Sequence, residues 1–329
     1  MQNKYYYSFL GLVFFLLISN SAILAAEKVA SATQDVATST TKIDYKALKV
    51  DLKSGVRKIF ETMNKNLPRE DFGVLPDGLE IIEGNGFRGI KITPVVLEFR
   101  TYTWYGDTGL LDNYNLCKEG GDDIVAAVNG TFYSERGALG QLITDGNVSN
   151  MRQFSGRLSR CFLAAFRGAK DSQYWYLGET ALNANELVVH HEKEMMWFNG
   201  PADATVRPDQ LIGGGGWILR NRKDVHQEAV DRQFFRFRAE DQTSRKTVIA
   251  QDSDRNIMFL VFEAGFSLHQ IAREFVKNEK FSKVQDAIFL DGGSSSCIVL
   301  KGKYLVAPLY MVDKARCSCI QVLRPQMIW

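Results

Sequence analysis

Beyond Pro68 the chain is a series of short β-rich runs separated by glycines and polar turns, and this pattern constrains the fold more than any other feature. Runs of about four to eight β-branched, aromatic and aliphatic residues between turn residues are typical of strands. The predicted strands are Leu79–Glu83, Gly89–Thr93, Val95–Trp104, Ile124–Val128, Tyr174–Leu177, Leu187–His190, Thr247–Ala250, Ile257–Glu263, Ala287–Leu290, Cys297–Leu300 and Ile320–Leu323. We therefore expect an α+β fold, a mixed, largely antiparallel, twisted sheet with a few packed helices.

Two segments have the apolar spacing of helices. Ser267 is a good N-cap residue, and the apolar residues between Leu268 and Val276 that follow it share one helical face. Apolar residues recur at the same spacing between Ile43 and Asn66, which predicts a second helix. No internal repeat or second linker divides the chain, so residues 45–329 are expected to form one domain.

The first 26 residues have the layout of a secretory signal peptide. Lys4 gives a positive start, and the apolar run Phe9–Ile18 is shorter than the ~20 residues that a membrane-spanning helix needs. We expect cleavage after Ala25 or Ala26, and no stable membrane anchor afterwards. Residues 27–44, rich in Ala, Thr and Ser, read as a flexible leader. The mature protein is expected to be secreted or periplasmic.

Composition excludes several classes of protein. The chain has 329 residues with 40 basic and 38 acidic side chains, so its charge gives no reason to expect nucleic acid as a partner. The four histidines are the adjacent pair His190 and His191, which lacks a partner at metal-ligand spacing, and two that stand alone in the sequence, His226 and His269. We therefore expect no zinc site and no cofactor. Five cysteines leave at least one thiol without an intramolecular partner.

The segment Asp286–Lys303, DAIFLDGGSSSCIVLKGK, is the first of four that could carry chemistry. An apolar strand ends at Asp291, where a rigid element would present the carboxylate to a loop and to solvent. Gly292 and Gly293 allow a tight turn whose N–H groups could approach an oxyanion, and the serines that follow add donors. The alternative is an ordinary hairpin with a Gly-Ser turn.

The second segment, Val125–Val148, also has a buried strand that ends in a polar residue, Asn129, followed by Gly130 and Thr131. Asn129 could serve a site or simply cap the strand. Farther on, Asp145 and Gly146 form a strong turn signal, so turn formation is the favoured interpretation of that carboxylate.

The other two segments are rich in cations and in glycine. Arg245 and Lys246 precede a strand, where Arg245 could bind a phosphate as a bidentate donor and Lys246 as a point charge; the alternative, above all for Lys246, is a solvated strand end. The sequence QDSDRN after that strand predicts a hairpin turn. Four glycines in Gln210–Asn221, QLIGGGGWILRN, could admit a ligand close to the backbone or mark a bulge or tight bend.

Taken in order, NGTFYS, GQLITDGN, SRKTVIA and LDGGSSS resemble the phosphodiester glycosidase family over roughly Asp77–Leu323. The resemblance implies an α+β domain that removes a sugar from a sugar-1-phosphodiester. The positions that match the family's site are Asn129, Gly130, Arg245, Thr247, Asp291, Gly292, Gly293 and Ser294. The chain departs from the family at Thr131, where a second Gly or an aromatic residue is usual, at the inserted Lys246, and at Glu263, where the family tends to have Asp.

The chemistry of such a substrate fits these residue types. A glycosyl phosphodiester already has a good leaving group, so the enzyme needs an anion cradle and a carboxylate near the anomeric carbon. On this hypothesis Arg245 and the amides of residues 292–294 hold the phosphate, Asp291 faces the sugar, and Asn129 orients the substrate. The partner would be a glycosyl phosphate or phosphoglycan.

The stereochemical outcome depends on a second carboxylate, for which Asp145 and Glu263 are the candidates. Two rival functions remain open. A serine hydrolase or acyltransferase would use a nucleophile among Ser294, Ser295 and Ser296 and needs a histidine base nearby. A non-catalytic envelope protein would bind glycan or phosphate with the same residues without cleaving it.

Overall fold

The computed structural model describes residues 70–324 except 95, 105–108, 135–136, 151–159, 168–172, 184–185, 192–193, 200–207, 234, 236–243 and 309–317. They all fall within one contact unit, Phe60–Trp329. The expected signal peptide, the flexible leader and the helix between Ile43 and Asn66 lie outside the described residues.

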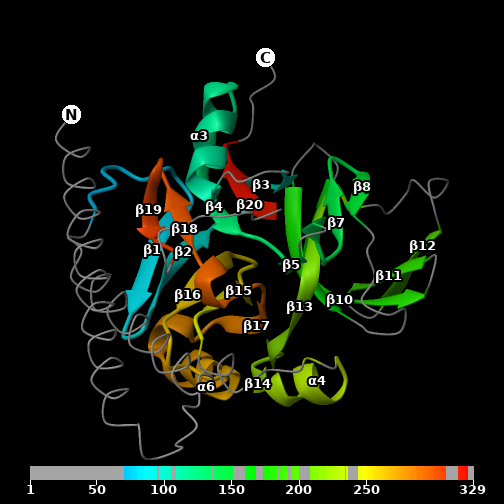
Figure 1. The fold of residues 1–329 in the computed structure, drawn as a ribbon. Coiled ribbons are helices and arrows are strands. Elements are labelled where there is room, and N and C mark those ends of the chain that lie inside the picture. The colour runs from blue at the N-terminus through cyan, green and yellow to red at the C-terminus, as the bar shows by residue number, and fades with distance from the viewer. Residues whose placement is uncertain are drawn as a thin grey trace, which may run out of the picture. The chain divides into compact units, whose positions relative to one another are not determined.

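Two antiparallel sheets form the centre of the fold (Figure 1). The larger sheet has the strand order β1 (Leu79–Gly84), β2 (Phe87–Ile92), β16 (Ile257–Phe262), β15 (Lys246–Asp252), β17 (Val284–Phe289), β13 (Gln210–Arg220), β9 (Arg160–Arg167), β10 (Gln173–Asn183), β11 (Glu186–His191) and β12 (Glu194–Asn199). Two further strands, β14 (Lys223–Asp224) and β7 (Leu142–Thr144), pair with β13, and β8 (Asn147–Asn150) pairs with β7. The smaller sheet has the order β19 (Lys303–Val306), β18 (Ile298–Leu300), β4 (Ile124–Asn129), β20 (Ser318–Leu323) and β3 (Glu98–Thr103).

The remaining elements are short. Strands β5 (Tyr133–Ser134) and β6 (Gly137–Ala138) pair with each other, and the α-helices of the described residues are α3 (Leu110–Glu119), α4 (His226–Asp231) and α6 (Leu268–Lys277). Every predicted strand overlaps a strand of the structure, and the predicted α+β class with its antiparallel pairing is confirmed. None of the described helices is long and apolar enough to cross a membrane.

Alternation along the strands gives each sheet two apolar faces, and the fold therefore has four layers. Between the sheets, Phe99, Val128 and Ile320 of the smaller sheet pack against Ile249 and Ile288 of the larger one. The outer face of the larger sheet is covered by α6, and that of the smaller sheet by α3, at opposite ends of the view in Figure 1. The core-facing residues of α6 are Leu268, Ile271, Ala272 and Phe275.

Helix α6 begins where the sequence predicted it. The hydroxyl of Ser267 accepts a hydrogen bond from the Gln270 amide, and the Gln270 side chain accepts one from the Ser267 amide. This reciprocal pair satisfies two N–H groups that the first turn of the helix would otherwise leave without partners.

The glycine run in β13 marks a bulge, as one of the two interpretations of the sequence held. The register of β13 against β9 shifts between Gly213 and Gly215, and Gly214 has a φ of +110°. A Cβ atom on Gly214 would lie 2.5 Å from the hydroxyl oxygen of Thr131, and one on Gly140 would lie 2.0 Å from it. Glycine is required because the segment that follows β4 packs directly against this strand.

Candidate functional site

The candidate site is built around residues 291–297, the segment that leaves the larger sheet at β17 and enters the smaller sheet at β18. Asp291, Gly292 and Gly293 are half-buried, whereas Ser294 is exposed. The Asp291 carboxylate therefore stands on a rigid strand end at the surface, as the sequence predicted.

Asn129, the last residue of β4, lies beneath this segment with its side chain buried. Its Nδ2 donates to the backbone carbonyl of Asp291 at 2.9 Å. Its Oδ1 accepts from the Thr247 hydroxyl at 2.8 Å and from the Cys297 amide at 3.0 Å. These bonds fix the amide orientation and occupy Oδ1 and one N–H of Nδ2, so Asn129 holds the Asp291 backbone in place.

Thr247 is fully buried in β15 and joins this network from the larger sheet. Its hydroxyl lies 3.1 Å from the Ser296 hydroxyl as well as bonding to Asn129. The residue expected from the motif SRKTVIA thus reaches the strand end of β4, a contact between residues 118 positions apart in sequence. We call Asn129, Arg245, Thr247 and Asp291 to Ser294 the Asn129–Asp291 cluster.

Arg245 precedes β15 and meets the glycine turn through its backbone. Its carbonyl accepts from the Gly293 amide at 2.8 Å, and a Cβ atom on Gly292 would lie 2.5 Å from that carbonyl oxygen. The guanidinium is buried and donates from Nη1 to the Ala307 carbonyl at 2.7 Å. Arg245 and Asp291, far apart in sequence, therefore converge.

The expected role of the glycine amides needs correction. The Gly292 amide donates to the Asp291 carboxylate at 3.0 Å, and the Gly293 amide donates to Arg245. Both N–H groups have partners within the protein, so in this structure they shape the turn and restrain the carboxylate rather than presenting donors to a phosphate.

Lys246 is likewise not the solvated strand end that we favoured from the sequence. It is 4% exposed, and its ammonium donates to the carbonyl and the hydroxyl of Ser244 at 2.8 and 3.0 Å. Side chains of successive residues in an extended strand alternate, so Lys246 and Arg245 are directed to opposite faces of the sheet.

Gly130 and Thr131 belong to the packing below the site. The Gly130 amide donates to the Ser318 carbonyl at 3.0 Å, and a Cβ atom there would lie 2.4 Å from the Ser318 hydroxyl. The Thr131 amide donates to the same hydroxyl at 3.2 Å. The Thr131 hydroxyl is buried and has no hydrogen-bond partner among the residues that the structure describes.

The two candidates for a second carboxylate occupy different surroundings. Asp145 lies in the β7–β8 turn with a φ of +49°, and it accepts from the Gln210 side chain at 2.7 Å, as expected of a turn residue. Glu263 directly follows β16. Lys246 pairs with Phe262 in the antiparallel β15–β16 ladder, so one further step of this register places Glu263 opposite Arg245.

The structure gives little support to a serine nucleophile. Ser295 and Ser296 are buried, which leaves Ser294 as the exposed hydroxyl of the three. The described imidazoles of His226 and His269 both bind Asp224, and the expectation that these histidines stand alone is wrong. These two histidines lie at the other end of β13 from the bulge. Their partner Asp224 pairs with Leu219, which is four residues beyond Gly215 and so about 13 Å along the strand.

Comparison with known proteins concerns the fold and the family. No curated protein matches the chain in sequence. Among solved structures, the catalytic domain of zebrafish N-acetylglucosamine-1-phosphodiester alpha-N-acetylglucosaminidase, auto-inhibited by its pro-peptide, is similar with a TM-score of 0.50 at 17% identity, covering 75% of this chain and 82% of that one. A Burkholderia pseudomallei protein described as exported is similar with a TM-score of 0.50 at 12% identity, covering 73% and 74%. At these identities the likeness shows a shared fold.

The sequence of the chain also identifies its family. The family model of the phosphodiester glycosidases matches residues 122–316, more than half of the 329 residues. That span contains Asn129, Arg245 and Asp291, which the fold brings together from three separate segments. A chain with this match and this convergence of motif residues belongs to the phosphodiester glycosidase family.

Proposed function

We propose that the protein is a secreted hydrolase that cleaves a sugar from a sugar-1-phosphodiester. The observation that carries the proposal is the convergence of Arg245 and the Asp291 strand end on one glycine turn, held by hydrogen bonds from Gly293 and Asn129. Family membership supports the same reaction class. The signal-peptide pattern of the first 26 residues supports secretion.

In this reaction water attacks the anomeric carbon, and the bond from that carbon to the phosphate oxygen breaks. The products are the free sugar and a phosphate monoester, which leaves as a stable anion. Arg245 supplies positive charge for the phosphate, and Asp291 acts at the sugar as base, as nucleophile or by stabilising oxocarbenium charge. The hydrogen bond from the Gly292 amide holds the Asp291 carboxylate in one orientation for this role.

Of the two candidates for a second carboxylate, Glu263 is the better placed. Continuing the β15–β16 register by one residue pairs it with Arg245, whereas the Asp145 side chain serves its own turn and Gln210. Glu263→Gln is therefore expected to lower kcat, and Asp145→Asn to leave kcat close to the wild-type value. The anomeric configuration of the first product, followed by NMR, distinguishes a retaining from an inverting reaction.

The direct test is incubation of the mature protein with a set of sugar-1-phosphodiesters, measuring free sugar with and without a chelator. Asp291→Asn is expected to reduce kcat by a factor of about 100 or more, as for loss of a reacting carboxylate. Asp286→Asn is the matched control, because Asp286 lies on β17 itself and accepts a hydrogen bond from the Asn221 amide, which asparagine can also do. Near-wild-type turnover by Asp291→Asn would refute the assignment, and binding without turnover by the wild type would favour a non-catalytic role.

A further inference from the structure

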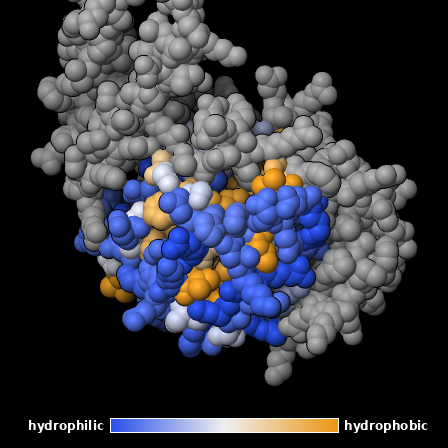
Figure 2. Space-filling view, turned by 90° about the horizontal axis from the view of Figure 1, so that it is seen from below, coloured by the Kyte–Doolittle hydropathy of each residue, from blue (hydrophilic) through white to orange (hydrophobic). Residues whose placement is uncertain are grey.

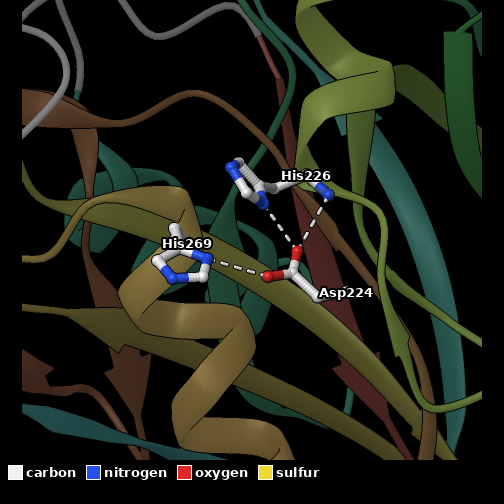
Figure 3. A group of neighbouring side chains, drawn as sticks. All are labelled: Asp224, His226 and His269. Atoms are coloured by element: carbon white, nitrogen blue, oxygen red, sulfur yellow. Dashed lines mark hydrogen bonds and ion pairs between the residues drawn. The ribbon is translucent and has the colours of Figure 1, made fainter.

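Asp224, His226 and His269 meet on the surface although they come from three elements (Figure 3). Asp224 ends β14, His226 begins α4, and His269 lies in the first turn of α6. One carboxylate oxygen is 2.6 Å from His226 Nδ1, and the other is 2.8 Å from His269 Nδ1. We call this group the Asp224–histidine cluster.

The Asp224 carboxylate is held in place between the two imidazoles. The His226 backbone amide donates to Asp224 Oδ1 at 3.1 Å, which fixes the carboxylate plane. The two imidazole rings lie with centroids 5.1 Å apart and tilted by 47°, so each directs Nδ1 toward the same carboxylate, as Figure 3 shows. One ligand atom from each of the three residues lies within 4.8 Å of the others.

We propose that the Asp224–histidine cluster binds a divalent transition-metal ion of the zinc class, at a site separate from the Asn129–Asp291 cluster. Two imidazoles and one carboxylate are a ligand set that suits zinc and the other late first-row transition metals, whereas magnesium and calcium prefer oxygen ligands alone. Zinc bonds of about 2.0–2.1 Å in tetrahedral geometry separate neighbouring ligand atoms by about 3.4 Å. The observed N–O separations therefore need to open by less than about 1 Å.

The side chains have the freedom for that movement. Exposed fractions are 28% for Asp224, 27% for His226 and 52% for His269. Metal binding requires the lone pair of Nδ1, so each neutral imidazole carries its proton on Nε2, or releases a proton to solvent if it is charged. Solvent supplies the remaining coordination positions, because the face that carries α6, β14 and α4 is largely hydrophilic (Figure 2).

The consequence of binding is structural. The ion would tie α6 to the β14–α4 segment, two elements that cover the larger sheet at the end of β13 remote from the bulge. Ligands that bind the folded state alone raise its stability by mass action. Zinc at a hundredfold excess over its dissociation constant is therefore expected to raise the melting temperature by about 5–10 °C.

Calorimetric titration of metal-free protein with zinc chloride tests the proposal. We expect one zinc per chain, and binding at least about tenfold weaker in His269→Gln and in Asp224→Asn, since loss of a mere outer-shell partner already costs about that much. The controls are Arg273→Gln on α6 and Asp231→Asn on α4, which keep the three ligands and should bind zinc like the wild type. Titration with magnesium chloride should give no heat of binding at this site.

Cobalt(II) gives a second readout that does not depend on stability. A visible absorption band on cobalt addition is expected for the wild type and both controls, and is lost in His269→Gln. Absence of zinc and cobalt binding in the wild type, or equal binding by ligand variants and controls, would overturn the proposal and leave a hydrogen-bonded surface cluster. Hydrolysis of a glycosyl phosphodiester is measured separately, so either proposal can fail without the other.

Discussion

The side-chain amide of Asn129 donates a hydrogen bond to the backbone carbonyl of Asp291, 2.9 Å away. The donor ends a strand of the smaller sheet, and the acceptor follows a strand of the larger one. The residue proposed to act on the sugar is therefore positioned by the opposite sheet, through an amide that is itself held by Thr247 and Cys297.

Replacing Asn129 by Asp tests this positioning. The change keeps the shape of the side chain but removes its N–H donor and adds a buried negative charge beside Asp291. We expect stability to fall by about 1–3 kcal/mol and kcat to fall by about tenfold or more, with KM changing less. Asn115→Asp, an exposed position in α3, controls for added charge. A variant with a lower melting temperature but unchanged kcat would show that Asn129 is only structural.

The two glycines of the turn should respond differently to a methyl group. In Gly292→Ala the new Cβ would lie 2.5 Å from the Arg245 carbonyl, so the turn must move, and we expect a loss of about 1–3 kcal/mol together with most of the activity. In Gly293→Ala nothing lies within 4 Å of the new atom, and the φ of +65° costs about 1–2 kcal/mol. Chemical denaturation and turnover of both variants compare the two positions, and equal losses of activity would contradict the clash.

Tyr114 links α3 to the smaller sheet and should make the protein sensitive to alkali. Burial raises the pKa of Tyr114 to about 12, from 10.0 for an unperturbed tyrosine, and its hydroxyl donates to the Ile124 carbonyl at 2.8 Å. A raised pKa means that this stabilising contribution is complete below pH 10 and is lost as the pH rises through 12. The melting temperature of the wild type should therefore fall more steeply between these values than that of Tyr114→Phe. Parallel curves would refute this explanation.

A polar network around Glu179 should contribute more than surface ion pairs do. Glu179 is 8% exposed and forms an ion pair with Arg232. Its carboxylate also accepts hydrogen bonds from the Trp217 indole at 3.0 Å and from the side-chain amide of Gln233 at 3.4 Å. Hydrogen bonding to Glu179 is the main reason that the pKa of Arg232 is raised. We expect Glu179→Gln to cost about 1–3 kcal/mol in urea unfolding.

Glu228→Gln is the control for that measurement. Glu228 bonds the same guanidinium at 2.6 Å, from the position four residues earlier on the surface of α4. An exposed helical pair of this kind contributes about 0.2–0.5 kcal/mol. If Glu179→Gln and Glu228→Gln lower the free energy of unfolding equally, the network around Glu179 contributes no more to stability than the surface ion pair.

Many of the strands could be predicted from the sequence because each is a local pattern, but β9 and β13 were not predicted. Runs such as Ile257–Phe262 and Ile124–Val128 are apolar throughout, since both of their faces are buried between layers. Helix α3 was not predicted, although its buried residues Leu110, Tyr114 and Cys117 have helical spacing. The polar Asn113 stands on the same face and weakens the signal.

The hydrogen bonds within the candidate site could be predicted less well than the residues that form it. Residue types and motifs identified Asn129, Arg245 and Asp291, but the hydrogen bond from Gly293 to the Arg245 carbonyl depends on strand register, which no local pattern encodes. The same holds for His269, which reaches Asp224 across 45 positions of sequence. Contacts of this kind follow from the packing of α6 on the sheet.

The bonds among Asn129, Thr247 and Cys297 join the two sheets directly below the turn that carries Asp291. These residues are as buried as the apolar core beside them, so the backbone at Asp291 cannot loosen without opening the layer between the sheets. Thermal inactivation should therefore coincide with cooperative melting of the sandwich, and a partly inactive but fully folded intermediate should not accumulate on heating.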